Sequence, residues 1–437
     1  MKKYYIDGYN LTIEDIILAT KGELGTVFMS EEAIERCKNS RNQIDKWMEK
    51  DAPVVYGVNT GLGNLKDTAL SPEEHLKWNK TIPYPHAVGM GEPIDGDITR
   101  AALLIRANLL CRGYSAVRPA LIQRMLDIFN AGISPVILEL GSTGLSDLGP
   151  LAQSAMIVAG LEEAEVFYKD RRDKAQTIFA EVGLEPVFEL ECKEVLAQMN
   201  GSTMTQSLAV FTYSMLEKLV RIHEEIEANI DPNKDDSCYS REKVSIAINN
   251  SLKFVSNIIN LENNISCDNP LLFETEKGNY EPVMGCNCSN TQVGYGLDLL
   301  NILIADMSNI IYENISLAEC DNPSVMGLKN MSLSILTKLR TLCMPASADS
   351  IPTKGNQEDH VEFSYGAARK AMKAVNLFKT LISYELCSVF LKDSYDVDQI
   401  TSKMLSQIKN KIGVFNKNST MTEMIKETEK YISNSII

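Results

Sequence analysis

The sequence predicts an all-α fold built around a bundle of long helices. Apolar residues alternate gaps of four and three, which keeps one stripe of a helix apolar over about five turns. These residues are Val293, Leu297, Leu300, Ile304, Met307 and Ile311. The run from 367 to 391 has similar periodicity, and alternating β-type runs are scarce. Stripes of this length are typical of helices that pack together in a bundle.

Shorter elements follow from local signals. Residues 11–20 and 251–264 have helical spacing as well. Residues 141–153 predict a turn that runs into a helix, because Asp147 is a suitable N-cap residue and Pro150 is tolerated in a first helical turn. The chain contains no repeat and no linker rich in proline or glycine, so nothing in it predicts independent modules.

Composition argues against several classes of partner. The chain has 437 residues, 44% of them hydrophobic and 23% charged, which is ample for a large core. Its net charge of −15 argues against nucleic acid and anionic membranes, because both would repel it. The first residues lack the apolar segment of a signal peptide, and no run approaches the ~20 apolar residues of a membrane span. We therefore expect a cytoplasmic protein.

The cysteines and histidines predict no metal site. Ten cysteines are scattered without Cys-x-x-Cys spacing, and none of the four histidines forms a His-x-x-x-His pair. Cys286-Asn287-Cys288 is the only close cysteine pair in the sequence. We interpret its two cysteines as packed or pocket-wall residues, with a redox or metal role as the alternative.

Six motifs occur in order between residues 56 and 361: YGVNTGLG (56–63), PHAVG (85–89), RANLLCRGYSAVR (106–118), NGS (200–202), SCDNP (266–270) and DSIPTKGNQEDHV (349–361). Together they resemble the motifs of the aromatic amino-acid ammonia-lyases, a family that includes histidine, phenylalanine and tyrosine lyases and related aminomutases. In that family the third motif is helical. The resemblance implies carbon–nitrogen lyase activity and an ammonia-lyase-like long-helix bundle of the fumarase/aspartase type.

Residues 141–153, GSTGLSDLGPLAQ, resemble the family's catalytic loop, in which an Ala-Ser-Gly triplet cyclises into the electrophile methylideneimidazolone. Here the triplet is Leu145-Ser146-Asp147, and the loop is one residue short. Ring closure needs a close backbone approach that glycine permits and a residue with a Cβ resists. We therefore expect no methylideneimidazolone and no other cofactor, with Ser146 acting as a hydrogen-bonding group.

The resemblance implies roles for residues around this loop. Tyr56 corresponds to the catalytic acid/base, in a glycine-rich loop suited to close over substrate. Its ordinary pKa near 10 requires nearby dipoles or cations to stabilise the phenolate. Tyr239 completes the pocket and Arg241 clamps the substrate carboxylate, although their motif lacks one residue and the segment before it is shortened. Asn200 contacts the substrate carboxylate or fixes Tyr56.

Four further residues correspond to substrate-contacting positions. His86 stands where the family distinguishes ring types, and a histidine there accompanies imidazole or phenol rings. Gln357 and Glu358 correspond to residues near the amine and the ring, where Glu358 could hold an imidazolium or a quaternary ammonium. Cys288 replaces an aromatic wall residue, which implies a pocket of different shape.

These departures lead to a functional hypothesis. Without the electrophile, elimination remains feasible if the substrate brings its own good leaving group, such as the trimethylammonium of a betaine. Ergothionases, which release trimethylamine from ergothioneine, fit this description. We therefore predict an electrophile-independent lyase that acts on a histidine-like betaine such as ergothioneine or hercynine.

Three alternatives stay open. The first is a conventional histidine or tyrosine ammonia-lyase in which the Leu-Ser-Asp triplet still cyclises. The second is a non-catalytic paralogue that serves as a binding or scaffold protein. The third is a different lyase or mutase that acts on another aromatic amino acid.

The resemblance also implies an organisation. We expect an N-terminal domain with the tyrosine loop over residues 1–120, a central helical bundle and oligomerisation core over 121–395, and C-terminal helices over 396–437. In the family four chains associate, and each active site draws on three of them. We therefore expect a homotetramer with shared sites.

Overall fold

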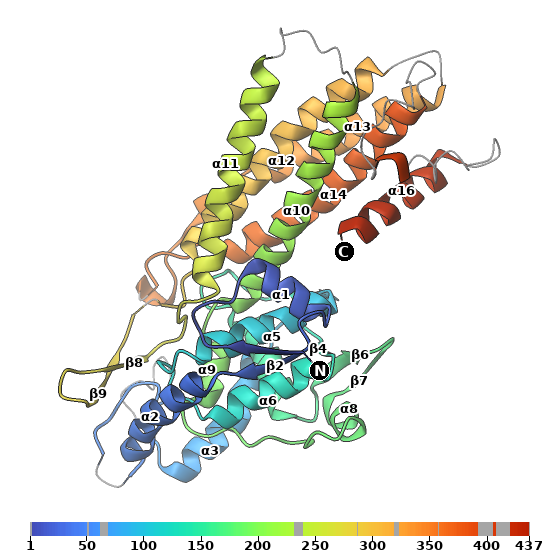
Figure 1. Cartoon of the computed structure of the whole chain (residues 1–437). Helices are drawn as coiled ribbons and strands as arrows, with labels where there is room; N and C mark the ends of the chain where they lie inside the picture. The colour runs from blue at the N-terminus through green and yellow to red at the C-terminus, as the bar shows by residue number, and fades with distance from the viewer. Residues whose placement is uncertain are drawn as a thin grey trace. The chain divides into compact units, whose positions relative to one another are not determined.

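The computed structural model of the chain describes residues 2–49, 52–61, 69–230, 239–285, 287–318, 323–356, 358–391, 405–407 and 420–436. Over these residues the chain is mainly helical, and its short strands form small sheets of two or three strands (Figure 1). The predicted helical fold class is thus confirmed. None of the described helices has both the length and the apolar character that a membrane span requires.

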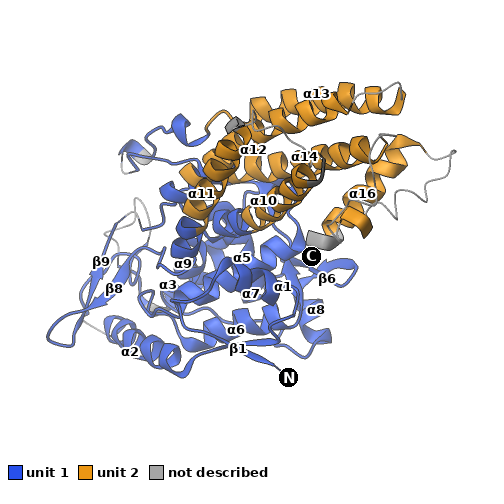
Figure 2. Cartoon of the chain, turned by 45° about the horizontal axis from the view of Figure 1, so that its top comes forward, with its two compact units in different colours: residues 1–210, 257–294, 346–366 blue, residues 211–256, 295–345, 367–437 orange. Residues whose placement is uncertain are grey.

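The chain divides into two compact units (Figure 2). Unit 1 comprises residues 1–210, 257–294 and 346–366, and unit 2 comprises residues 211–256, 295–345 and 367–437. The predicted domain boundaries after residues 120 and 395 stay a prediction, and much of the segment 396–437 lies outside the described residues.

Unit 1 contains most of the short elements. In chain order they are β1 (Lys3–Ile6), α1 (Ile13–Thr20), β2 (Thr26–Met29), α2 (Glu31–Trp47), α3 (Pro72–Thr81), α4 (Pro83–His86), β3 (Met90–Pro93), α5 (Gly96–Leu110), α6 (Pro119–Asn130), β4 (Ile133–Pro135), β5 (Leu138–Leu140), α7 (Leu148–Ala159), β6 (Glu165–Tyr168), β7 (Arg171–Lys174), α8 (Ala175–Glu181), α9 (Glu194–Met199), β8 (Leu271–Glu274), β9 (Tyr280–Val283) and the 3-10 turns Ser347–Asp349 and Lys354–Asn356.

Helix α5 forms the core of unit 1. Its residues from Ile98 to Leu110 are buried except for Arg100, and most of them are apolar. The sheets are a parallel pair β1–β2, antiparallel pairs β3–β5 and β8–β9, and the antiparallel sheet β4–β6–β7. These strands are too short for a clear alternation of apolar and polar residues to be visible in the sequence.

Unit 2 is built from the long helices, which run side by side in both views (Figures 1 and 2). They are α10 (Thr203–Ile230), α11 (Tyr239–Glu262), α12 (Thr291–Leu317), α13 (Pro323–Leu342), α14 (Ser364–Phe390) and α16 (Met421–Ile436), the first three and α14 each having one end in unit 1. The six residues of the predicted apolar stripe lie on α12 and are at most 1% exposed, which confirms the stripe. Helix α16 packs on α14 through contacts such as Cys387 with Thr428.

The element boundaries differ from the predictions in two places. The helix expected over 106–118 ends at Leu110, because a turn at Gly113 follows with a φ of 83°. A Cβ at Gly113 would also lie 3.2 Å from the carbonyl oxygen of Arg36, so this turn favours glycine. The helix expected over 251–264 begins at Tyr239, before the stretch with clear periodicity.

Candidate active site

Ser146 has a left-handed backbone conformation, with a φ of 57°. A residue with a Cβ rarely adopts this conformation, so surrounding contacts must hold it. The Ser146 hydroxyl donates to Oδ1 of Asn200 at 2.7 Å and accepts the N–H of Gly201 at 3.2 Å. Two residues that the sequence selected, Ser146 and Asn200, are thus brought into direct contact.

Cys288 joins this pair through its backbone. Its carbonyl oxygen accepts the N–H of Ser146 at 3.2 Å and lies 2.5 Å from the hydroxyl of Ser202. The Ser202 hydroxyl is also 2.9 Å from the carbonyl oxygen of Gly144. We call Ser146, Asn200, Ser202 and Cys288 the Ser146 cluster. The Cys288 side chain is half-buried, and its predicted role as a pocket wall stays a prediction.

Asp147 occupies the N-cap position of α7, as predicted, but its carboxylate does not cap that helix. The carboxylate instead accepts the N–H of Thr205 at 2.7 Å, in the first turn of α10. The hydroxyls of Thr205 and Ser142 donate to it at 3.0 and 2.6 Å. Burial raises the pKa of Asp147 to about 7, although these hydrogen bonds oppose the shift. Asp147 therefore ties loop 141–147 to the start of α10.

Glu362 makes a similar contact with α12. It is fully buried, and Oε1 accepts the N–H of Asn290 at 2.7 Å, one residue before that helix. Burial raises the pKa of Glu362. Burial also raises the pKa of nearby Glu262 to about 7, and repulsion from Glu362 adds to this shift. The N-termini of α10 and α12 are thus each met by a buried carboxyl group, Asp147 or Glu362. When ionised, each carboxyl group offsets the positive end of its helix.

Tyr56 is half-buried at the head of its glycine-rich loop, whose last two residues lie outside the described residues. The Asn59 side chain anchors the loop through three backbone groups of residues 47–55, at 2.7, 2.9 and 3.0 Å. Gly57 has a φ of 70°, and a Cβ there would lie 2.8 Å from Cδ of Pro270. The loop therefore rests against the turn 266–270. The catalytic role of Tyr56 stays a prediction.

His86 ends the short helix α4 and is half-buried. Its Nδ1 lies 2.8 Å from the carbonyl oxygen of Ile82. Because a carbonyl oxygen only accepts, this bond places the proton on Nδ1 and leaves Nε2 of a neutral ring as an acceptor. Gly89 packs on α7, where a Cβ would meet Oε1 of Gln153 at 2.7 Å. The segment thus lies against the helix that follows Ser146, and its role in ring selection stays a prediction.

Glu358 also lies in unit 1. Its carboxylate accepts the hydroxyl of Thr353 at 2.5 Å, and the two residues form an isolated β-bridge. Gln357 lies outside the described residues. The predicted contacts of both residues with substrate stay predictions.

Arg241 and Tyr239 belong to α11 in unit 2. The Arg241 guanidinium contacts Glu227 at 3.1 Å, Asn314 at 2.8 Å and Glu313 at 3.3 Å, all within the same unit. The Tyr239 side chain lies outside the described residues. The roles of both residues stay predictions, and the contacts of Arg241 give it a structural function in the bundle.

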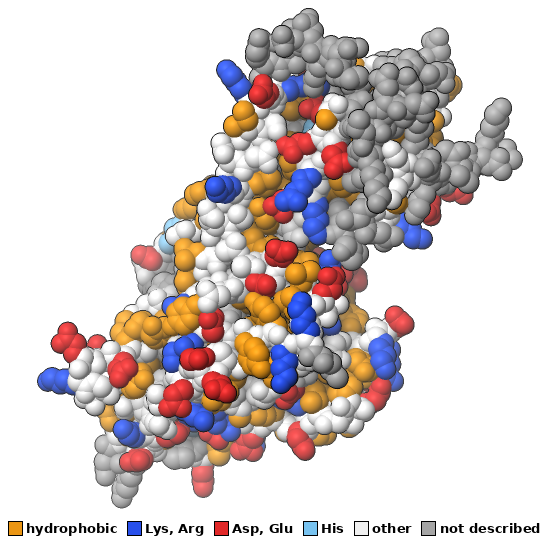
Figure 3. Space-filling view, in the orientation of Figure 1, with side chains coloured by type: hydrophobic (Ala, Val, Ile, Leu, Met, Phe, Trp, Pro, Cys, Tyr) orange, Lys and Arg blue, Asp and Glu red, His pale blue; other side chains and the backbone are white. Residues whose placement is uncertain are grey.

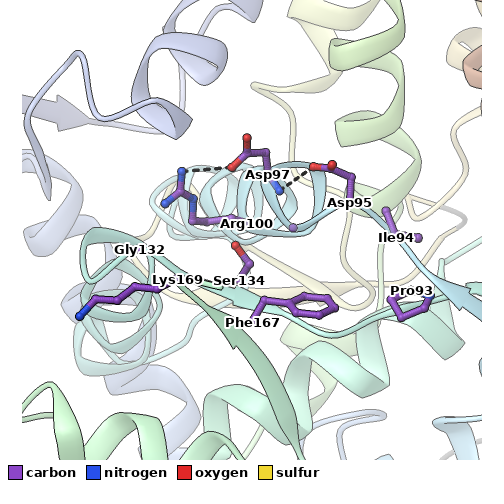
Figure 4. Close-up of a pocket in the computed structure, with 10 residues that line it drawn as sticks. Pro93, Ile94, Asp95, Asp97, Arg100, Gly132, Ser134, Phe167 and Lys169 are labelled. Atoms are coloured by element: carbon purple, nitrogen blue, oxygen red, sulfur yellow. Dashed lines mark hydrogen bonds and ion pairs between the residues drawn. The ribbon is translucent and has the colours of Figure 1, made fainter. Parts of the chain in front are cut away.

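A separate hollow of about 540 Å³ lies in unit 1 (Figure 4). Its lining includes Asp97 and Arg100 of α5, Asp95 just before that helix, Phe167 of β6 and Lys169 from the turn after β6. Asp97 and Arg100 are 3.4 Å apart and partly neutralise each other. None of the predicted site residues lines this hollow, so the motif residues indicate a different place for the chemistry.

Sequence reasoning passed over two buried charged residues near the Ser146 cluster. Arg106 is 3% exposed, and its guanidinium donates to the carbonyl oxygens of Ala197 and Asn200 at the end of α9. Arg106 lies in a mainly apolar stretch of α5, and this was a usable signal because burying a charge requires partners. Nothing in the sequence distinguishes Glu362 from a surface acid.

The chain matches a sequence model of the family described as aromatic amino acid lyase, over residues 11–230 and 243–410. The interval between these matches contains Tyr239 and Arg241. The histidine ammonia-lyase of Alkaliphilus oremlandii (strain OhILAs) is 28% identical and aligns over 96% of this chain and 95% of its own. That of Geobacillus sp. (strain WCH70) is 29% identical, over 98% and 96%.

Solved structures give the same fold. Histidine ammonia-lyase from Trypanosoma cruzi aligns with a TM-score of 0.85 at 25% identity, over 100% of this chain and 94% of that one. Ergothionase from Treponema denticola, in complex with desmethyl-ergothioneine sulfonic acid, aligns with a TM-score of 0.86 over 100% of both chains. Its 18% identity shows a shared fold alone. By the family match over most of its length, this chain belongs to the aromatic amino acid lyases and is a carbon–nitrogen lyase.

Proposed function

We propose that this lyase works without methylideneimidazolone and releases trimethylamine from a histidine-like betaine such as ergothioneine or hercynine. The observation that carries the proposal is the triplet Leu145-Ser146-Asp147, whose last residue is fixed by its own side chain. The proposal extends the family assignment to a leaving group and a substrate class.

The residues of the triplet do not fit the cyclised group. Ring closure would require the Asp147 nitrogen to swing onto the Leu145 carbonyl carbon. Three hydrogen bonds, from Ser142 and from two groups of Thr205, hold the Asp147 carboxylate in a buried position. A glycine has no side chain to restrain this movement, whereas Asp147 would have to give up bonds that a buried carboxyl group needs.

The charges near the Ser146 cluster favour a cationic leaving group. When ionised, the buried carboxyl groups of Asp147 and Glu362 offset the positive ends of α10 and α12. Among the described residues, Oε2 of Glu362 has no hydrogen-bond partner. A quaternary ammonium carries its charge without N–H groups and needs no hydrogen-bond acceptor. Burial raises the pKa of both carboxyl groups, and a cation bound near them would favour their ionised form, which attracts it through Coulomb energy.

The reaction is a β-elimination. Tyr56, as phenolate, takes the proton from the carbon next to the imidazole ring, and the C–H electron pair forms the carbon–carbon double bond. The C–N bond breaks, and trimethylamine leaves as a neutral molecule with the bonding electrons. Asn200 or Arg241 holds the substrate carboxylate, and His86 or Glu358 engages the ring. For Arg241 this role requires its ion pairs with Glu227 and Glu313 to open.

One assay separates the leading possibilities. The purified protein is incubated with ergothioneine, hercynine, histidine and tyrosine, and ammonia and trimethylamine are measured separately. We expect trimethylamine from a betaine and no ammonia from the amino acids. Release of ammonia alone would contradict the proposed leaving group, and failure to release either amine would contradict the proposed substrate class.

The second candidate is a histidine ammonia-lyase with an atypical triplet. The curated relatives at 28% and 29% identity carry that name, which favours this alternative. It requires the triplet to cyclise with loss of two water molecules. Intact-protein mass spectrometry therefore distinguishes the two candidates, because a lyase without the cyclised triplet keeps the mass calculated from its sequence.

The same proposal includes a homotetramer in the cytoplasm. Exposed apolar side chains recur seven residues apart on three long helices, a spacing typical of helix–helix interfaces. The pairs are Phe254 and Leu261, Tyr295 and Ile302, and Met326 and Leu333, each residue being 45–56% exposed. Figure 3 shows apolar side chains along the outer surfaces of long helices on one face. A second copy of the chain would cover such stripes.

Light scattering tests the assembly, which should have four times the chain mass of 48.6 kDa. Phe254→Lys should yield smaller species, because a charge in an apolar seam is costly to bury. The cytoplasmic location is supported by free thiols at Cys37, Cys111, Cys192, Cys267, Cys288, Cys343 and Cys387, which suit a reducing compartment. Localisation of a tagged chain in cell fractions checks it.

A further inference from the structure

A fully buried ion pair joins the two segments that hold Asn200 of the Ser146 cluster. The ammonium group of Lys193 donates to Oδ2 of Asp268, and the two side chains are 0% and 1% exposed. Lys193 immediately precedes α9 and has a left-handed backbone with a φ of 71°. Burial lowers the pKa of this lysine, and Asp268 opposes that shift. Neither residue contributes to the reaction proposed above.

The two residues belong to the segments that hold Asn200. Lys193 lies at the start of α9, and Asn200 follows the last residue of that helix. Asp268 uses Oδ1 to accept the N–H of Asn269 at 2.7 Å, which fixes the turn 266–270. The carbonyl oxygen of Asn269 in turn accepts Nδ2 of Asn200 at 3.1 Å. One side of Asn200 is therefore held by this turn, and the other side meets Ser146.

The same turn supports the Tyr56 loop. Pro270, two residues after Asp268, lies against Gly57, where a Cβ would approach to 2.8 Å. Leu196 of α9 lies on the same side of Gly57, at 3.0 Å from that Cβ position. The ion pair thus joins the two segments against which the tyrosine loop rests.

A buried ion pair is poor support for stability alone. Desolvation of two charges offsets much of their attraction, and well-packed apolar residues often replace such a pair without loss. What the pair provides is a fixed geometry, because each charge has few alternative partners inside the protein. Arg106 reinforces this frame through its bonds to the carbonyl oxygens of Ala197 and Asn200.

We propose that Lys193 and Asp268 are positioning residues, which hold Asn200 against Ser146 by locking α9 to the turn 266–270. The inference rests on the proposed function only in assigning Asn200 to the active site. It predicts that the pair acts on the reaction through Asn200 and not through general stability.

Two variants test the inference. Lys193→Met with Asp268→Asn removes both charges and leaves no unpaired buried ion, while the new side-chain amide keeps an acceptor for the N–H of Asn269. Asp268→Glu keeps the charge but lengthens the side chain by one methylene, and it serves if the first variant does not fold. Arg124→Met is the matched control. Arg124 is also a buried cation in unit 1, and it contacts the carbonyl oxygen of Val158 and the ring of Phe179.

The decisive measurement is a double-mutant cycle with Asn200→Ala on the substrate that the wild type turns over. We expect either pair variant to lower kcat/KM at least about tenfold at a temperature where it is folded, and to cause less than about a twofold further loss in the Asn200→Ala background. Arg124→Met should lower the melting temperature and leave kcat/KM within about twofold. The inference would be overturned if the losses caused by the pair variant and by Asn200→Ala multiplied. It would also be overturned if both pair variants retained the kcat/KM of the wild type.

A crystal structure of the Lys193→Met and Asp268→Asn double variant, or of Asp268→Glu, gives a readout that does not depend on activity. We expect the Ser146–Asn200 contact of 2.7 Å to be lost. A retained contact would overturn the positioning role even for a protein with no lyase activity. Conversely, an inactive wild type with a displaced Asn200 in the variant would contradict the proposed function and leave the positioning role supported.

Discussion

The carboxylate of Asp147 accepts the backbone N–H of Thr205 at 2.7 Å, across 58 positions of the sequence. This contact satisfies a backbone N–H in the first turn of α10 from a distant segment of the chain. Asp147 directly follows Ser146, so the same contact holds the loop that carries the Leu145-Ser146-Asp147 triplet. The contact therefore joins the start of α10 to the loop whose chemistry decides whether the electrophile can form.

Asp147→Asn should flatten part of the pH dependence of stability. The pKa of Asp147 rises from 3.8 to about 7 on folding, so the folded state retains a proton that the unfolded state has released. Stability is therefore highest below pH 4 for this group and falls as the pH rises to about 7. Glu262 titrates in the same window, so some slope remains. Urea unfolding at pH 5 and pH 8 measures the difference, and an unchanged slope would contradict the burial of an ionisable Asp147.

Ser146→Ala should lower the activity only about fivefold if the enzyme works without the electrophile. The substitution removes a hydrogen bond to Asn200, which costs about 1 kcal/mol or about fivefold in rate. An enzyme that builds its electrophile from this serine would instead lose nearly all activity. Steady-state kinetics with the active substrate decide the point, and Ser142→Ala is a control for the loss of a hydroxyl in the same loop.

Tyr56→Phe should lower kcat by about 10²- to 10⁴-fold, the range expected when a general acid/base is removed. The phenyl ring keeps the packing of the loop, so the melting temperature should change little. Binding of substrate, measured by calorimetry, should persist. A variant that retains full activity would remove Tyr56 from the mechanism.

Glu385→Gln should destabilise the bundle of unit 2. Burial alone would lower the pKa of His223, but Glu385, 3.0 Å away, raises it above the ordinary 6.5 with help from Glu227 and Glu224. The imidazolium–carboxylate pair thus stabilises the fold fully below pH 6.5, and this contribution is lost as the pH rises through the folded pKa. Breaking the pair should cost about 3–5 kcal/mol at pH 6.

The exposed carboxylate of Glu313 provides the control for that experiment. Its substitution by Gln removes one partner of Arg241 at the surface, which should cost less than about 1 kcal/mol. Denaturant unfolding of both variants at pH 6 and pH 9 gives the comparison. Equal losses at both pH values for Glu385→Gln would show that His223 is not charged in the folded protein.

Arg241→Gln should act mainly on stability. The guanidinium is held by Glu227 and Asn314 within unit 2, so its loss leaves a half-buried carboxylate without its cation. We expect a lower melting temperature and a KM within about twofold of the wild type. A rise of about tenfold in KM would instead support Arg241 as the clamp of the substrate carboxylate.

The helical fold class could be predicted from the amino-acid sequence, and the candidate residues stay predictions. The stripe on α12 could be predicted because helix periodicity is a local property, and all six of its residues are buried. The motifs pointed to Ser146 and Asn200 separately, and their contact became visible only in the folded chain. The missing glycine at the triplet is visible in the sequence alone.

Which charged groups meet became visible only in the folded chain. Asp147 was predicted to cap α7 and instead contacts α10, while Glu362 and Lys193 gave no sequence signal. Long-range partners depend on where separate segments converge, and composition or periodicity carries no information about that convergence. The electrostatic character of the site is therefore a property of the tertiary structure, because burial and distance set the strength of each interaction.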